Sequence, residues 1–193
     1  MSGNKVNHHL FIRENRPLVF SEKTLEKVRQ LVKRYPEGQQ KSALLPVLHM
    51  AQEENGGYLT VDAMDYVASL LQLKPVEVYE VATFYSMYFL EKTGKYVIEV
   101  CQTAPCAVCG GEALLEHLEE KLGVKKGETT ADGLFTLRGV ECLGGCGYAP
   151  VLQVNTRFHE HMSIAMADEL IDRLRHEHSN GVMTGKKWEE EFC

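Results

Sequence analysis

The stretch that decides the fold reads DGLFTLRGVECLGGCGYAP and spans residues 132–150. Residues 134–140 are rich in apolar and β-branched side chains, which is typical of a strand. Cys142 and Cys146 follow this strand and are separated by three residues. The glycines at 144 and 145 let backbone N–H groups approach sulfur, where they tune a bound metal group. The pattern therefore predicts a loop that presents two thiols at one edge of a sheet.

A second cysteine pair follows an earlier strand. Residues 95–100 read KYVIEV and run directly into Cys101, and four residues separate Cys101 from Cys106. Thirty-five residues lie between the two pairs. If the two strands are neighbours, both loops emerge at the same edge, and the four cysteines can close around a core of two irons and two sulfides. Soft thiolates suit iron in such a cluster, and four of them complete tetrahedral coordination at both irons.

The sequence leaves open two other functions for the cysteines, a structural zinc site and a redox-active dithiol. Four-cysteine zinc modules tolerate spacings of about two to four residues within a pair. Cys106 and Cys109 also spell the C-x-x-C of a thiol–disulfide oxidoreductase. We favour Cys109 as a spare thiol, because a complete set of four ligands exists without it, and we expect Cys193 to be a bystander.

The hydrophobic pattern predicts an α+β protein with a helical bundle followed by a sheet domain. Helical spacing of apolar residues covers 21–35, 41–54, 60–71 and 75–89, with Thr60 as a cap and Pro46 in a first turn. Residues 95–176 predict a β-α-β-β-α domain, with helices at 112–122 and 166–176 and a third strand at 151–155. We divide the chain into an extension (1–20), a helical bundle (21–92), a cluster domain (93–177) and a tail (178–193).

Composition narrows the function classes. The 193 residues carry a formal charge of -6, which opposes phosphate-backbone binding, so we expect no nucleic acid partner. No apolar run reaches the roughly 18 residues of a membrane span, and the start lacks the pattern of a secretory signal or transit peptide, so a soluble, unexported protein is expected. In a reducing compartment, six cysteines suggest metal binding or redox chemistry before disulfides. The sequence has no glycine-rich nucleotide-binding fingerprint or phosphate loop, so nucleotides are expected to bind elsewhere.

The cysteine motifs also carry a resemblance to a known family. The run 132–136, followed by five residues and by Cys142 to Pro150, resembles the signature of the small thioredoxin-like [2Fe-2S] subunit of NADH:quinone oxidoreductase, respiratory complex I. The likeness continues in residues 103–106, 82–89 and 55–59, so it covers roughly residues 20–175.

This resemblance implies a thioredoxin-like [2Fe-2S] ferredoxin domain behind the helical bundle. It implies that Cys101, Cys106, Cys142 and Cys146 hold one [2Fe-2S] cluster, that FMN and NADH bind to a partner flavoprotein subunit, and that other peripheral-arm subunits surround the chain. It also implies an oxidoreductase subunit with no catalytic residues of its own, held at the cytoplasmic face of the inner membrane. NAD-linked hydrogenases and formate dehydrogenases use closely similar subunits, and these stay as alternatives.

Three smaller features complete the expectations. The aromatic run 84–89 predicts a helix that packs into its core; the alternative is that an exposed part of it contacts the flavoprotein. His159 and His161 would share one face of a strand and are expected to be solvated. The Ala149–Pro150 bond is trans by default, with the isomer left undecided.

Overall fold

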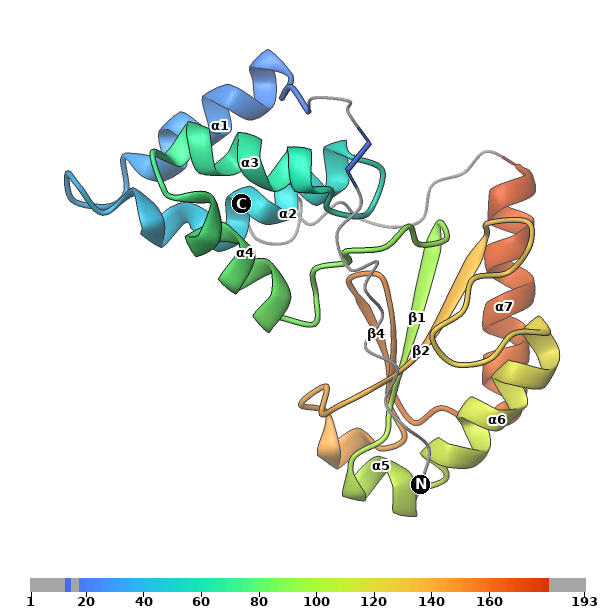
Figure 1. Ribbon diagram of the computed structural model, residues 1–193. Helices are drawn as coiled ribbons and strands as arrows, with labels where there is room; N and C mark the ends of the chain where they lie inside the picture. The colour runs from blue at the N-terminus through green and yellow to red at the C-terminus, as the bar shows by residue number, and fades with distance from the viewer. Residues whose placement is uncertain (1–12, 15–17, 181–193) are drawn as a thin grey trace, which may run out of the picture. The chain divides into compact units, whose positions relative to one another are not determined.

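A computed structural model of the chain describes residues 13–14 and 18–180. The chain forms two compact units, which divide between Lys92 and Thr93. The first is helical and the second contains the sheet, as Figure 1 shows. Together they confirm the predicted α+β class. Among the described residues, no helix combines the length and apolar character needed to cross a membrane.

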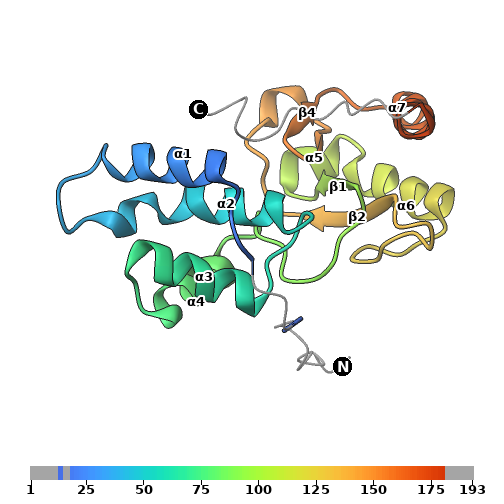
Figure 2. The ribbon, with the colours of Figure 1, turned by 90° about the horizontal axis from the view of Figure 1, so that it is seen from above.

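In the described residues of the first unit there are four α-helices, and Figure 2 shows them gathered in one bundle. They are α1 (Glu22–Val32), α2 (Leu44–Glu54), α3 (Val61–Leu71) and α4 (Pro75–Phe84), with a short 3₁₀ turn, η1 (Gln40–Ala43), before α2. Large side chains from α2, α3 and the loop between them are fully buried; they include Leu44, Leu48, Leu59, Met64 and Leu71. The buried positions follow the predicted helical spacing.

Two helix starts in this unit agree with the sequence prediction. Thr60 caps α3, and its Oγ1 accepts a hydrogen bond from the Ala63 backbone N–H at 3.1 Å. Ser21 caps α1, and its Oγ accepts one from the Thr24 N–H at 3.3 Å. Pro46 is the third residue of α2, so its missing N–H falls in the first turn, where no helical partner exists.

The predicted fourth helix is too long. The prediction ran to about Phe89, whereas α4 ends at Phe84. The reason is a contact distant in sequence: the buried side chain of Gln52 donates to the Met87 carbonyl at 3.1 Å and accepts from the Phe89 N–H at 2.7 Å. The Phe89 carbonyl accepts in turn from the Leu59 N–H at 2.7 Å. These bonds hold the segment after α4 outside a helix.

Up to Asn180, where its described part ends, the second unit consists of a four-stranded mixed sheet and three α-helices. Its elements are β1 (Tyr96–Cys101), α5 (Ala104–Val108), α6 (Gly111–Leu122), β2 (Phe135–Val140), the 3₁₀ turn η2 (Cys146–Tyr148), β3 (Leu152–Val154), β4 (Arg157–His159) and α7 (Ile164–Ser179). The strand order is β2-β1-β3-β4. Strands β1 and β2 are parallel, and the other two pairs are antiparallel.

Helices α6 and α7 lie side by side along the sheet (Figure 1) and share one core with it. Lys121 of α6 pairs with Asp168 of α7 at 2.9 Å, and His117 lies 2.8 Å from the same carboxylate. Alternate residues of β1, Tyr96, Ile98 and Val100, belong to this core. Alternate side chains of a strand point to the same face of the sheet, so the two helices cover the face that carries these apolar residues.

The predicted β-α-β-β-α order was incomplete. The five-residue helix α5 and the three-residue strand β4 are additional elements that the sequence prediction missed. His159 ends β4, and His161 lies beyond it with a φ of 50°, so the prediction that both histidines share a strand face was wrong. Helix α7 continues to Ser179, beyond the predicted end at residue 176. Cys193 and the rest of the tail after Asn180 lie outside the described residues.

Candidate metal centre

Both cysteine loops leave the sheet at the same end. Cys101 is the last residue of β1, and it is in register with Val140, the last residue of the parallel neighbour β2. Cys106 lies on α5, and Cys142 follows two residues after β2. Figure 1 shows α5 and the loop after β2 at this end of the sheet. The condition that the sequence left open, that the two strands are neighbours, is met.

The four thiols form two pairs. Cys101 and Cys106 are each only 2% exposed, and their thiols are hydrogen-bonding neighbours. Cys142 and Cys146 are exposed, and their thiols form the second such pair. Cys146 is also close enough to both buried thiols for their charges to interact. One pair is thus enclosed by protein and the other faces outward.

This arrangement fits a two-iron group. Two thiol pairs are what a [2Fe-2S] cluster needs, because its two irons share four cysteines. The donor chemistry fits as well, since thiolate sulfur is the preferred ligand of iron–sulfur clusters.

Hydrogen bonds converge on the buried sulfurs. The Thr103 hydroxyl lies 3.3 Å from Sγ of Cys101, and the backbone N–H groups of Thr103 and Leu143 also donate to that sulfur. Burial raises the pKa of the Cys101 thiol, but these hydrogen bonds outweigh burial, and the pKa is lowered. The Val151 N–H donates to Cys106, whose pKa is nevertheless raised, chiefly by burial.

The exposed pair has a donor of its own. The Gly144 N–H donates to Sγ of Cys142 at 3.3 Å, and Gly144 has a φ of 79°, which glycine adopts without strain. The pKa of Cys146 is raised, chiefly by its hydrogen bond with Cys142. The predicted role of the glycines, to bring N–H groups to sulfur, is therefore seen at Gly144.

Helix α6 begins in close contact with both buried cysteines. A Cβ on Gly111 would lie 2.8 Å from the Cys106 carbonyl oxygen and 3.0 Å from that of Cys101. The first distance is shorter than real Cβ contacts and the second is tighter than most of them, so a side chain here would force the main chain to shift. Sequence reasoning missed Gly111, although the Gly110-Gly111 pair directly after Cys109 was a visible signal. It also missed the backbone donors Leu143 and Val151, because a backbone N–H leaves no mark on residue type.

The structure answers two questions that the sequence left open, the position of the Cys109 thiol and the isomer of the Ala149–Pro150 bond. Cys109 caps the C-terminus of α5 and is exposed, and its thiol belongs to neither pair. The Ala149–Pro150 peptide bond, whose isomer the sequence left undecided, is cis.

Fold and site define a class of protein: a thioredoxin-like unit that carries paired cysteines at one end of its sheet. The chain belongs to the family of thioredoxin-like [2Fe-2S] ferredoxins, whose model matches residues 28–175. The resemblance found in the sequence is confirmed, and the family identifies the chain as an iron–sulfur protein.

Individual relatives agree with the family. The chain is 44% identical over 161 residues to a subunit of the NADH-quinone oxidoreductase of Rickettsia felis, a match that covers 83% of this chain and 96% of that protein. It is 41% identical over 171 residues to the corresponding protein of Rickettsia prowazekii, covering 89% and 97%. Among solved structures, an NAD⁺-reducing [NiFe]-hydrogenase in the air-oxidized state is similar, with a TM-score of 0.62 and 26% identity. That match covers 74% of this chain and 24% of the hydrogenase chain.

Proposed function

We propose that this chain is the small electron-transfer subunit of an NADH:quinone oxidoreductase, and that Cys101, Cys106, Cys142 and Cys146 hold its one [2Fe-2S] cluster. The observation that carries the proposal is the meeting of two thiol pairs at one end of the parallel strands β1 and β2. Relatives that are 41–44% identical over nearly their whole length, and whose names make them subunits of NADH-quinone oxidoreductase, support the assignment.

The chain's own residues bind and shield the cluster. When bound, a [2Fe-2S] cluster supplies a centre that takes up and releases one electron. The buried thiols of Cys101 and Cys106 hold the side that is closed to water, and the N–H groups of Leu143 and Val151 donate to their sulfurs. Donors to sulfur stabilise negative charge and so raise the reduction potential of the site. The exposed thiols of Cys142 and Cys146 hold the side that a partner can approach.

A partner subunit supplies the chemistry that this chain lacks. We propose that FMN and NADH bind to a flavoprotein subunit, because this sequence has no nucleotide-binding fingerprint. The other peripheral-arm subunits complete the assembly, which lies at the cytoplasmic face of the inner membrane.

The helical unit offers a surface for that assembly. At the end of α4, Phe84 is 79% exposed, and Tyr85 and Met87 are also exposed, whereas Tyr88 is buried. The run 84–89 is thus only partly a core segment. We propose that residues 21–92 dock against neighbouring subunits, that residues 93–177 carry the cluster and that 1–20 form an extension. The tail expected from residue 178 starts inside α7, which ends at Ser179.

One structural comparison favours a related assembly as second candidate. The likeness to an NAD⁺-reducing hydrogenase suggests an equivalent subunit in an NAD-linked hydrogenase. The two functions differ in the electron donor and in the partners, while the cluster would be the same.

An experiment on the intact assembly separates the two candidates. The full chain, carrying an affinity tag, is isolated anaerobically from its own cells together with its partners. We expect FMN in the assembly, reduction of the [2Fe-2S] electron paramagnetic resonance signal by NADH, and NADH:quinone activity in the membrane fraction. Copurification of a nickel–iron subunit, with reduction of the same signal by hydrogen, would overturn the proposal in favour of the hydrogenase.

A further inference from the structure

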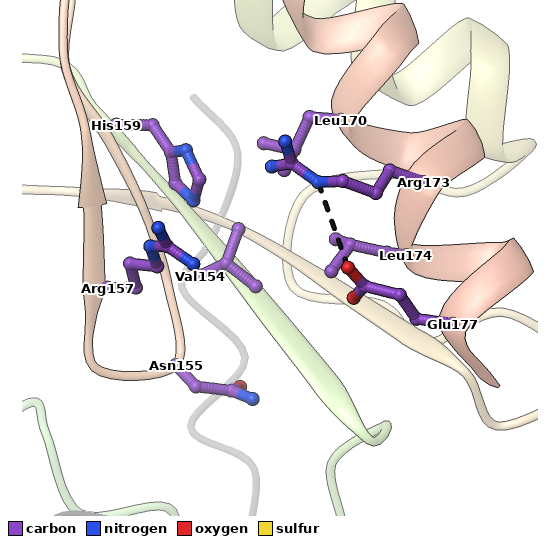
Figure 3. A pocket seen from close by; sticks show the side chains of 8 residues that line it. All are labelled: Val154, Asn155, Arg157, His159, Leu170, Arg173, Leu174 and Glu177. Carbon is purple, nitrogen blue, oxygen red and sulfur yellow. Dashed lines mark ion pairs between the residues drawn. The ribbon is translucent and has the colours of Figure 1, made fainter. Parts of the chain in front are cut away.

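A pocket in the second unit lies between the β3–β4 hairpin and α7, and none of the cysteines lines it (Figure 3). Arg157 and His159 reach it from β4, and Arg173 and Glu177 reach it from α7. Its apolar lining includes Leu174. Polar side chains from β4 and from α7 therefore line the same pocket, together with apolar side chains.

The hairpin that carries Arg157 is firmly anchored. Arg157 pairs with Val154 across a two-residue turn that begins at Asn155, which has a φ of 53°. The Asn155 side chain accepts from the Val97 N–H at 2.8 Å and donates to the Lys95 carbonyl at 3.2 Å. Both bonds tie the turn to β1. The backbone under Arg157 is thus held in place before any ligand arrives.

Positive charge in the pocket exceeds negative charge. Two guanidinium groups face one carboxylate, and that carboxylate, Glu177, lies 3.9 Å from Nε of Arg173. Arg157 forms no ion pair within the described part of the chain. His159 is half-buried, and its pKa is lowered, chiefly by burial and then by Arg157 and Arg173. The excess is notable in a chain whose formal charge is -6.

We propose that this pocket binds one oxyanion of the phosphate or carboxylate class, with Arg157 as its main ligand and Arg173 and His159 as supporting ones. A guanidinium presents a planar fork of N–H donors that matches the paired oxygens of phosphate and carboxylate. Both arginines stay exposed to solvent, so the expected attraction is modest and weakens with ionic strength. The proposal concerns a site apart from the cysteines, and it stands whether or not the cluster assignment holds.

Calorimetric titration of the full chain with inorganic phosphate tests the site. Ionic strength is kept constant with chloride, so that only specific binding gives a saturable signal. We expect one phosphate per chain with a dissociation constant in the millimolar range or tighter. Arg157→Gln should weaken binding by about 10-fold or more, which corresponds to the loss of one charge-assisted hydrogen-bonded contact. Arg157→Lys should recover part of that loss.

Controls and a second ligand complete the design. Lys126→Gln removes one exposed positive charge elsewhere in the same unit and should leave phosphate binding unchanged. A parallel titration with succinate separates the two ligand classes, since tighter binding of succinate would assign a carboxylate and tighter binding of phosphate a phosphate group. The proposal is overturned if neither anion binds saturably, or if Arg157→Gln binds as well as the unaltered chain. An unchanged far-ultraviolet circular dichroism spectrum shows that each variant is folded.

Discussion

Arg138 donates a hydrogen bond to the buried carboxylate of Glu99, with 3.0 Å between Nη1 and Oε1. The two residues are register partners on β2 and β1, and Glu99 precedes Cys101 by two residues. Glu99 is only 7% exposed. Burial raises the pKa of Glu99, and Arg138 opposes that rise. An ion pair therefore joins the two strands that lead to the cysteine loops.

Removing Arg138 should destabilise the sheet in a pH-dependent way. Removing one partner of a buried ion pair lowers the free energy of unfolding by roughly 3–5 kcal/mol. Because Arg138 is partly exposed, we expect a smaller loss for Arg138→Gln, about 2 kcal/mol at neutral pH. Because the variant raises the pKa of Glu99 further, the carboxyl stays protonated over a wider range, and the loss shrinks as the pH falls toward the ordinary glutamate pKa. Urea unfolding at neutral and acidic pH measures the difference. An equal loss at both values would contradict this account of the pair.

Gly111→Ala should disturb the metal centre through the backbone. The added methyl group would collide with the carbonyl oxygens of Cys106 and Cys101, both of which are main-chain atoms that cannot rotate away. We expect this variant to hold much less iron per chain and to unfold at least about 2 kcal/mol more easily. Gly147→Ala is the matched control, because a Cβ there meets no atom within 4 Å and should be tolerated. Equal iron content in both variants would show that the contact is unimportant.

The helix cap at Thr60 should contribute measurably to the stability of the first unit. Thr60 is buried, and its hydroxyl accepts the Ala63 N–H of α3. Thr60→Ala leaves that N–H without its side-chain partner, at a cost of about 1–2 kcal/mol. Thr60→Ser keeps the hydroxyl and should cost less than half as much. Thermal unfolding at one fixed scan rate compares the three chains, and a serine variant as unstable as the alanine variant would count against the cap.

His49 should make the first unit sensitive to acid. Burial lowers the pKa of His49 to about 4 from its ordinary 6.5, so the folded chain resists protonation at pH values where the unfolded chain accepts a proton. The unfolded state therefore binds more protons between these two values, and stability falls as the pH falls through that window, by about 3 kcal/mol in total. His49→Gln should lose this part of the pH dependence in urea unfolding. His176→Gln, on the exposed end of α7, should retain it.

The sequence predicted the parts of the fold that depend on local pattern. Helical spacing placed α1, α2, α3 and α6 to within a few residues, because each has one buried stripe and a cap or glycine at its end. Two short apolar runs, each followed within two residues by a cysteine, indicated the strands β1 and β2, whereas their parallel pairing is a finding of the structure. The meeting of the two cysteine loops at one end of the sheet therefore agrees with what residue type and spacing suggested.

Other features depend on contacts that no local pattern reveals. Helix α4 ends early because Gln52, more than thirty residues upstream, bonds the backbone around Phe89. Strand β4 is only three residues long, and two of its three side chains are exposed, so it has too little apolar alternation to be recognised. Helix α5 is different: Thr103 before Ala104-Pro105 is a normal helix start, and this signal was overlooked.

The four-cysteine assignment is tested most directly by iron and sulfide analysis of the anaerobically purified chain, with electron paramagnetic resonance spectra recorded after reduction by dithionite. We compare the unaltered chain with Cys142→Ser and Cys109→Ser. The assignment predicts about two irons and two sulfides per chain and a reduced-state signal, both unchanged in Cys109→Ser. In Cys142→Ser the signal should be lost or altered. A chain that contains zinc in place of iron, or one whose signal depends on Cys109 and not on Cys142, would contradict the assignment.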